Sequence, residues 1–144
     1  MWTHCLLAKR MRSWCTKPTF MKYLIWVIAE IALVFVLLSL PGSSFTDRTG
    51  WLHLLPIDKI VHVILFGSLA WSFYSFFDKA SIQALKSVRA QAWAMIFCIV
   101  YGIAMEYYQK WYVQSRGFEV KDMIADAAGV LLAFPLYQLW KKRQ

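Results

Sequence analysis

The run FMKYLIWVIAEIALVFVLLSL, residues 20–40, decides the fold of this chain. A helix needs about 20 predominantly apolar residues to cross the hydrocarbon core of a bilayer. This run has that length, carries charge only at Lys22 and Glu30, and is followed by the turn residues Pro41 and Gly42. It therefore predicts a transmembrane helix.

Three further apolar runs of similar length follow, at residues 58–77, 91–109 and 122–140. Pro56 lies just before the second run, where proline suits the start of a helix. Pro135 lies inside the fourth run, where proline removes one backbone hydrogen bond and can kink a helix. The sequence therefore predicts an all-α fold, a polytopic bundle of four transmembrane helices.

The composition agrees with a membrane protein. Hydrophobic residues make up 60% of the 144, and the mean hydropathy is +0.47, whereas soluble domains are nearer half apolar. The net charge of +8 comes from Lys and Arg in short clusters between the apolar runs, which argues against a nucleic-acid partner. Cys5, Cys15 and Cys98 lack the spacing of a metal site, and we expect no disulfide framework.

The distribution of basic residues predicts how the helices cross the membrane. Eleven of the 16 Lys and Arg residues fall on one side of the predicted topology and five on the other. The positive-inside rule places the richer side, with both termini, in the cytoplasm. We expect a basic segment at residues 1–19, a membrane domain at 20–140 and a basic tail at 141–144. The first apolar run exceeds the roughly 7–15 residues of a signal peptide, so we interpret it as a retained span.

Polar residues gather at one end of the predicted bundle, in the stretch EYYQKWYVQSRGFEVKDMIAD, residues 106–126, and at the start of the second span. Neighbours on one helix are three or four residues apart, which places them on one face. Ionisable groups within spans usually face the bundle interior and mark functional sites. We predict one shared pocket near the outer interface, with these ligand-binding candidates: Lys59, His62, Glu106, Gln109, Arg116, Asp122 and Asp126.

Several of these positions also have a plainer interpretation. Asp58 and Asp122 could cap helix starts, because acidic side chains suit helix N-termini. Lys59 could extend its ammonium group to the lipid headgroups. Arg116 could form a loop salt bridge with Glu119 or Asp122.

Three carboxylates lie deeper than a cap. Glu106 and Asp126 are about one turn inside their apolar runs, roughly 5 Å at 1.5 Å per residue. Glu30 is halfway along the first span, and Tyr101 and Ser68 fall near the same level, where either could hydrogen-bond it. A structural hydrogen bond between helices and a functional role are both open for Glu30.

Three blocks of the sequence, in this order, resemble the VanZ-like membrane proteins: DKIVH at residues 58–62 with Phe66 after it, the ExxQ motif as EYYQ at 106–109, and the pattern R-x5-D-x6-G at Arg116, Asp122 and Gly129. The resemblance covers residue 40 to the end of the fourth span. One departure is Asp126, where the family usually has asparagine, and it adds a negative charge.

The resemblance implies a small, helical, multi-pass protein of the bacterial cytoplasmic membrane. The founding member of the family is linked to low-level resistance to the glycopeptide teicoplanin. An effect on glycopeptide susceptibility is therefore an expectation for this chain, while the family likeness implies no particular reaction.

Three functions are compatible with the predicted pocket. The first is binding of an anionic, lipid-linked cell-wall precursor, with Lys59, Arg116 and Lys121 on phosphate. The second is an intramembrane enzyme, using acid–base chemistry or a divalent metal, although no cofactor is predicted. Its catalytic candidates are Glu106, His62, Asp122 and Asp126. The third is a structural polar network. The expected partners are the lipid bilayer and the lipid-linked precursor.

Overall fold

A computed structural model describes residues 18–40, 57–79, 87–114 and 116–143. Within these ranges the chain forms helices and no strand: α2 (Pro18–Leu38), α3 (Ile57–Lys79), α4 (Val88–Tyr112) and α5 (Val120–Lys142). Each of these helices is long and apolar enough to cross a membrane. The predicted all-α fold with four transmembrane helices is confirmed. The expected basic segment at residues 1–19 lies almost wholly outside the described residues.

The helix bounds differ from the predicted spans by one to three residues at each end. α3, α4 and α5 are longer than their apolar runs because polar residues continue each helix beyond the hydrocarbon level. α4 begins where the side chain of Ser87 accepts a hydrogen bond from the backbone N–H of Ala90, at 3.3 Å, which satisfies one of the free donors of the first turn. α5 continues as one helix through Pro135.

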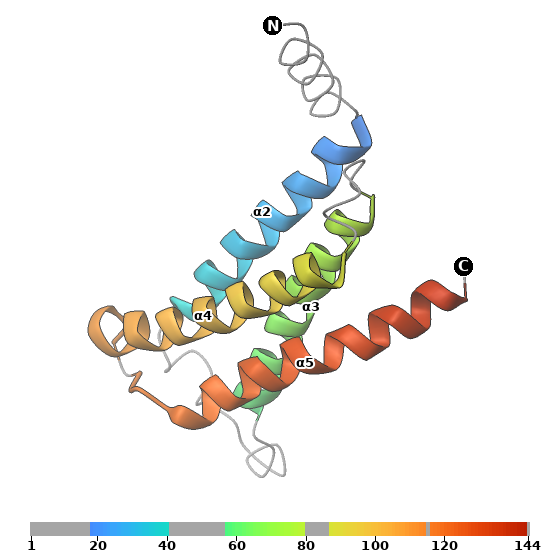
Figure 1. Cartoon of the computed structure of the whole chain (residues 1–144). Helices are drawn as coiled ribbons and strands as arrows, with labels where there is room; N and C mark the ends of the chain where they lie inside the picture. Colours follow the sequence, from blue (N-terminus) through green and yellow to red (C-terminus); the bar gives the residue numbers. More distant parts are fainter. Residues whose placement is uncertain (1–17, 41–56, 80–86, 115, 144) are drawn as a thin grey trace, which may run out of the picture.

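The four helices alternate in direction, so their ends meet in two groups (Figure 1). At one end, Gln109 near the end of α4 donates to the carbonyl of Leu38 at the end of α2, at 2.9 Å. At the other end, Gln138 of α5 donates to Gln91 of α4, at 3.2 Å. We call the first group of helix ends the site end and the second the opposite end.

α3 and α5 cross in very close contact at two glycines. The nearest atoms to a Cβ placed on Gly67 would be backbone atoms of Gly129, from 3.4 Å. A Cβ placed on Gly129 would lie only 3.0 Å from the Cα of Val63 and nearer still to its carbonyl oxygen. Small residues at such a crossing let helix backbones approach in a membrane, where packing drives association. On α3 the crossing extends from Val63, next to His62, to Gly67, and on α5 Gly129 lies three residues after Asp126, so the crossing brings His62 and Asp126 together.

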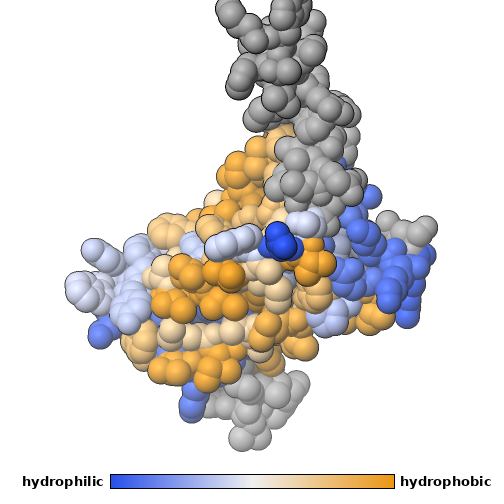
Figure 2. Space-filling view, in the orientation of Figure 1, coloured by the Kyte–Doolittle hydropathy of each residue, from blue (hydrophilic) through white to orange (hydrophobic). Residues whose placement is uncertain are grey.

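The surface of the bundle is apolar around its middle. Figure 2 shows hydrophobic residues across the middle of the visible face, with hydrophilic residues toward its two ends. Large exposed apolar side chains come from all four helices, among them Trp26, Ile64, Trp93 and Leu131. A protein with this surface is stable in lipid rather than in water, since exposed apolar patches of this extent are rare on soluble monomers. The chain is therefore a multi-pass membrane protein in contact with the bilayer.

Candidate functional site

Lys59, in the first turn of α3, pairs with two carboxylates at the start of α5. Its Nζ atom lies 2.6 Å from Oδ1 of Asp122 and 2.9 Å from Oε2 of Glu119. The Asp122 side chain is almost fully buried, while the Glu119 side chain is about half exposed. The pKa of the Glu119 carboxyl lies below its ordinary value, chiefly because Lys59 donates a hydrogen bond to it. The expected cap at Asp122 is not seen, because Glu119 is the N-cap residue and Asp122 lies inside the first turn.

His62 and Asp126 form a buried pair one turn deeper. The Nδ1 atom of His62 lies 2.8 Å from Oδ1 of Asp126, and both side chains are 1% exposed. An ionised carboxylate only accepts hydrogen bonds, so with Asp126 ionised Nδ1 carries the proton and donates it. The other ring nitrogen, Nε2, is buried and has no hydrogen-bond partner among the described residues.

Glu106 approaches the same pair from α4. Its side chain is fully buried, and Oε2 accepts a hydrogen bond from the backbone N–H of Glu119 at 3.1 Å. Its Oε1 and the Oδ2 atom of Asp126 have no hydrogen-bond partner among the described residues. Gly102 leaves room here, because a Cβ at that position would lie 2.7 Å from Oδ2 of Asp126. Three helices therefore surround one buried group of ionisable side chains.

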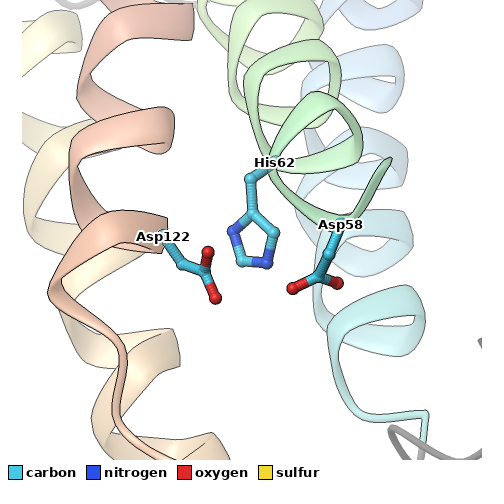
Figure 3. Close-up of side chains that lie close together, drawn as sticks. All are labelled: Asp58, His62 and Asp122. Carbon is cyan, nitrogen blue, oxygen red and sulfur yellow. The ribbon is translucent and has the colours of Figure 1, made fainter. Parts of the chain in front are cut away.

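Figure 3 shows the imidazole of His62 between the carboxylates of Asp58, on the same helix, and Asp122, on α5. The Asp58 side chain is 44% exposed, and its Oδ1 lies 3.5 Å from Arg116 of the segment between α4 and α5. Together these residues are the polar cluster of the site end: Asp58, Lys59, His62, Glu106, Arg116, Glu119, Asp122 and Asp126. Two sets within it could hold a metal ion, Asp58–His62–Asp122 and His62–Glu106–Asp126, because one ligand atom from each member lies within 4.8 Å of the others.

The structure places the seven predicted binding residues at one end of the bundle. One of them, Gln109, contacts α2 and is not part of the polar cluster. The amide of Gln109 donates to the carbonyl of Leu38 and thus ties α4 to α2. Asp58 and Glu119, which the sequence offered only as a possible helix cap and a possible salt-bridge partner of Arg116, also belong to the polar cluster. The spacing of Asp58 four residues before His62 carried a usable signal, since residues at i and i+4 share a helix face.

Glu30 lies outside the polar cluster, near the middle of α2. Its Oε2 atom lies 3.3 Å from the hydroxyl of Ser68, one of the two partners expected at this depth, and the same hydroxyl lies 2.9 Å from the backbone carbonyl of Leu65. The hydroxyl of Tyr101, the other expected partner, donates instead to the backbone carbonyl of Ile31 at 3.0 Å. Both contacts join α2 to a neighbouring helix, which favours the structural interpretation of Glu30.

Comparison with known proteins agrees with the resemblance seen in the sequence. The family model described as VanZ/LLP1 matches residues 13–141, which include the whole polar cluster and the described helices apart from the last residue of α5. No curated protein and no solved structure gives a significant match. The chain belongs to the VanZ/LLP1 family of membrane proteins.

Proposed function

We propose that this VanZ-family protein binds the polar headgroup of a lipid-linked cell-envelope molecule at the site end of its bundle. The positive-inside rule places this end on the outer face of the bacterial cytoplasmic membrane. Cell-wall precursors and the glycopeptides that bind them meet on that face. An effect on teicoplanin susceptibility would follow if the bound molecule is such a precursor.

The observation that supports this proposal is a set of buried polar atoms with no hydrogen-bond partner among the described residues. They are Nε2 of His62, Oε1 of Glu106 and Oδ2 of Asp126. A buried polar group without a partner costs about 1–3 kcal/mol, more when it is charged. Sugar hydroxyl and amide N–H groups would donate to the two carboxylate oxygens and remove that cost.

The cations of the polar cluster would contact the phosphate of such a headgroup. Lys59 already binds two carboxylates, so it can keep Glu119 and turn from Asp122 toward a phosphate oxygen. Arg116 is paired with Asp58 at 3.5 Å, near the outer limit for a hydrogen bond, and its guanidinium matches phosphate geometry. The headgroup would therefore exchange partners within the polar cluster, and one of its own donors would have to replace Lys59 at the buried Asp122.

Thermal unfolding of the purified chain in detergent tests this function. The ligands are a polyisoprenyl phosphate, a polyisoprenyl-linked saccharide–peptide precursor and the neutral polyisoprenol, each with and without divalent cations. We expect the phosphate-bearing lipids to raise the melting temperature of the wild type and of Asp78→Asn. This control lies at the opposite end, where Asp78 pairs with Lys141. The isosteric variant Glu106→Gln should lose the effect of the precursor.

Two outcomes would refute headgroup binding. In the first, the neutral polyisoprenol stabilises the wild type as much as the phosphates do, which would show binding of the isoprenoid tail alone. In the second, no lipid stabilises the wild type and Glu106→Gln melts well below it. The polar cluster would then be a structural network that fixes the helix packing.

A second candidate function is hydrolysis or transfer at the same headgroup, and the His62–Asp126 pair favours it. A carboxylate on Nδ1 of an imidazole leaves Nε2 as the basic atom, which is how general bases are oriented in many hydrolases. Turnover would be measured as release of inorganic phosphate or of headgroup from the precursor in detergent. Turnover by the wild type that is lost in Glu106→Gln or Asp126→Asn with folding intact would support the enzyme. Wild-type protein that binds the precursor but never turns it over would exclude the enzyme for that substrate.

A further inference from the structure

Three side chains of the polar cluster converge on one point at the site end. Asp58 and His62 lie one turn apart on the same face of α3, and Asp122 faces them from α5 (Figure 3). One ligand atom from each lies within 4.8 Å of the others. Two ligand atoms that each bind one ion at about 2.0–2.3 Å are at most roughly twice that distance apart, which agrees with this separation.

The orientation of His62 supplies the second, independent observation. Asp126 engages Nδ1 at 2.8 Å, which fixes the ring and leaves Nε2 as the available nitrogen. Nε2 is buried, without a hydrogen-bond partner among the described residues, and the ring lies between the two carboxylates of Asp58 and Asp122. Metal-binding histidines almost always donate their other ring N–H to a carboxylate or carbonyl in this way.

We propose that Nε2 of His62 and the carboxylates of Asp58 and Asp122 bind one divalent cation, with Asp126 as the positioning residue. One imidazole and two carboxylates form a mixed nitrogen and oxygen donor set. Such sets suit Mn²⁺, Fe²⁺, Co²⁺ and Zn²⁺ better than Mg²⁺ or Ca²⁺, which prefer oxygen alone. The half-exposed side chain of Asp58 gives the cation a route from solvent to the buried imidazole.

The charges around the site favour a cation. The ionisable carboxylates of the polar cluster outnumber its Lys and Arg side chains: Asp58, Glu106, Glu119, Asp122 and Asp126 against Lys59 and Arg116. The nearest competing charge is Lys59, at 2.6 Å from Asp122. Its second carboxylate, Glu119 at 2.9 Å, lets Lys59 remain paired while Asp122 turns to the cation.

The other possible set, His62 with Glu106 and Asp126, is less favourable. In that set Asp126 would have to serve both as a ligand and as the partner of Nδ1, so the site would have no separate positioning carboxylate. The two sets share only His62, so substitutions distinguish them. Glu106→Gln removes a ligand from this second set alone, and Asp58→Asn removes one from the proposed set alone.

Metal binding is measured directly on the full chain in detergent, after removal of cations with a chelator. Mn²⁺ is titrated and the free ion is followed by electron paramagnetic resonance. Co²⁺ absorption then reports a nitrogen ligand. No lipid ligand is added, so the outcome is independent of the proposed headgroup function. We expect about one Mn²⁺ per chain, with Asp58→Asn weakening the affinity at least about tenfold.

Three variants complete the test. Asp58 is exposed, so Asp58→Asn should fold normally, and Asp78→Asn at the opposite end should bind Mn²⁺ like the wild type. Lys59→Met should bind Mn²⁺ about tenfold more tightly or better, because a positive charge beside the ion is removed. If the wild type and Asp58→Asn bind Mn²⁺ with equal affinity, the proposal is overturned. Loss of binding in Glu106→Gln with retention in Asp58→Asn also overturns it, in favour of the second set.

Discussion

Replacing Gly129 by alanine is expected to push α3 and α5 apart and to break the His62–Asp126 contact. The new Cβ would lie 3.0 Å from the Cα of Val63 and closer still to its carbonyl oxygen. Both are backbone atoms that no rotamer change can move. Restoring ordinary contact requires a separation of about 1 Å between the helices. Added to the 2.8 Å between His62 and Asp126, this exceeds the roughly 3.5 Å at which a hydrogen bond ceases to count.

Overpacking of this kind costs about 1–3 kcal/mol. Gly67→Ala is the matched control, because it lies at the same crossing but its Cβ would meet Gly129 at 3.4 Å, an ordinary contact. Gly117→Ala has nothing within 4 Å and controls for the change of residue type. The free energy of unfolding in detergent should fall for Gly129→Ala and stay within about 0.5 kcal/mol for both controls. Equal stability of Gly129→Ala and Gly67→Ala would refute the packing argument.

Three further predictions concern charges and hydrogen bonds. Lys59→Met leaves Asp122 buried without its cation and should lower the free energy of unfolding by about 1–3 kcal/mol. The double variant with Asp122→Asn should regain most of that loss, and no recovery in the double variant would contradict the pairing. Because the folded pKa of Glu119 is lowered below its ordinary value of 4.5, its contribution to stability is complete above that pH and is lost as the pH falls through the folded pKa. The stability difference between wild type and Glu119→Gln should thus be largest near pH 7 and shrink below pH 4.5, and a difference that grows on acidification would reverse the assigned sign. Ser68→Ala removes the hydrogen bond to Glu30 and should cost about 0.6 kcal/mol in chemical unfolding, while an effect above about 2 kcal/mol would mean that Glu30 has another role.

The four helices and their alternation could be predicted from the sequence because hydropathy and length determine which segments cross a bilayer. The same pattern gave the depth of each polar residue, so the site end could be recognised before its contacts were known. Depth along a helix does not fix rotation about its axis. For this reason Tyr101 and Ser68 were equivalent candidates for Glu30, and only the structure shows that Ser68 binds it.

Pairings across helices were the part that could not be predicted. Gln109 shares a face with Glu106 at i and i+3, yet its long side chain reaches the end of α2. Lys59 pairs with Asp122 and Glu119 where α3 and α5 lie close together, and the backbone contact at Gly67 and Gly129 allows that close approach. The sequence shows each glycine in its apolar run, but it does not show which glycine of another helix will lie against it.

Glu119 connects three helices through two different groups of the same residue. Its backbone N–H binds Glu106 of α4, its carboxylate binds Lys59 of α3, and it begins α5. A ligand that takes either partner weakens the hold on this one residue and on the connection between α4 and α5 that leads to it. Binding of any such ligand and loss of these contacts would be thermodynamically linked, each shifting the other by the same free energy. The proposed headgroup and the proposed cation both leave the two contacts of Glu119 in place, so the start of α5 would stay fixed while the site is loaded.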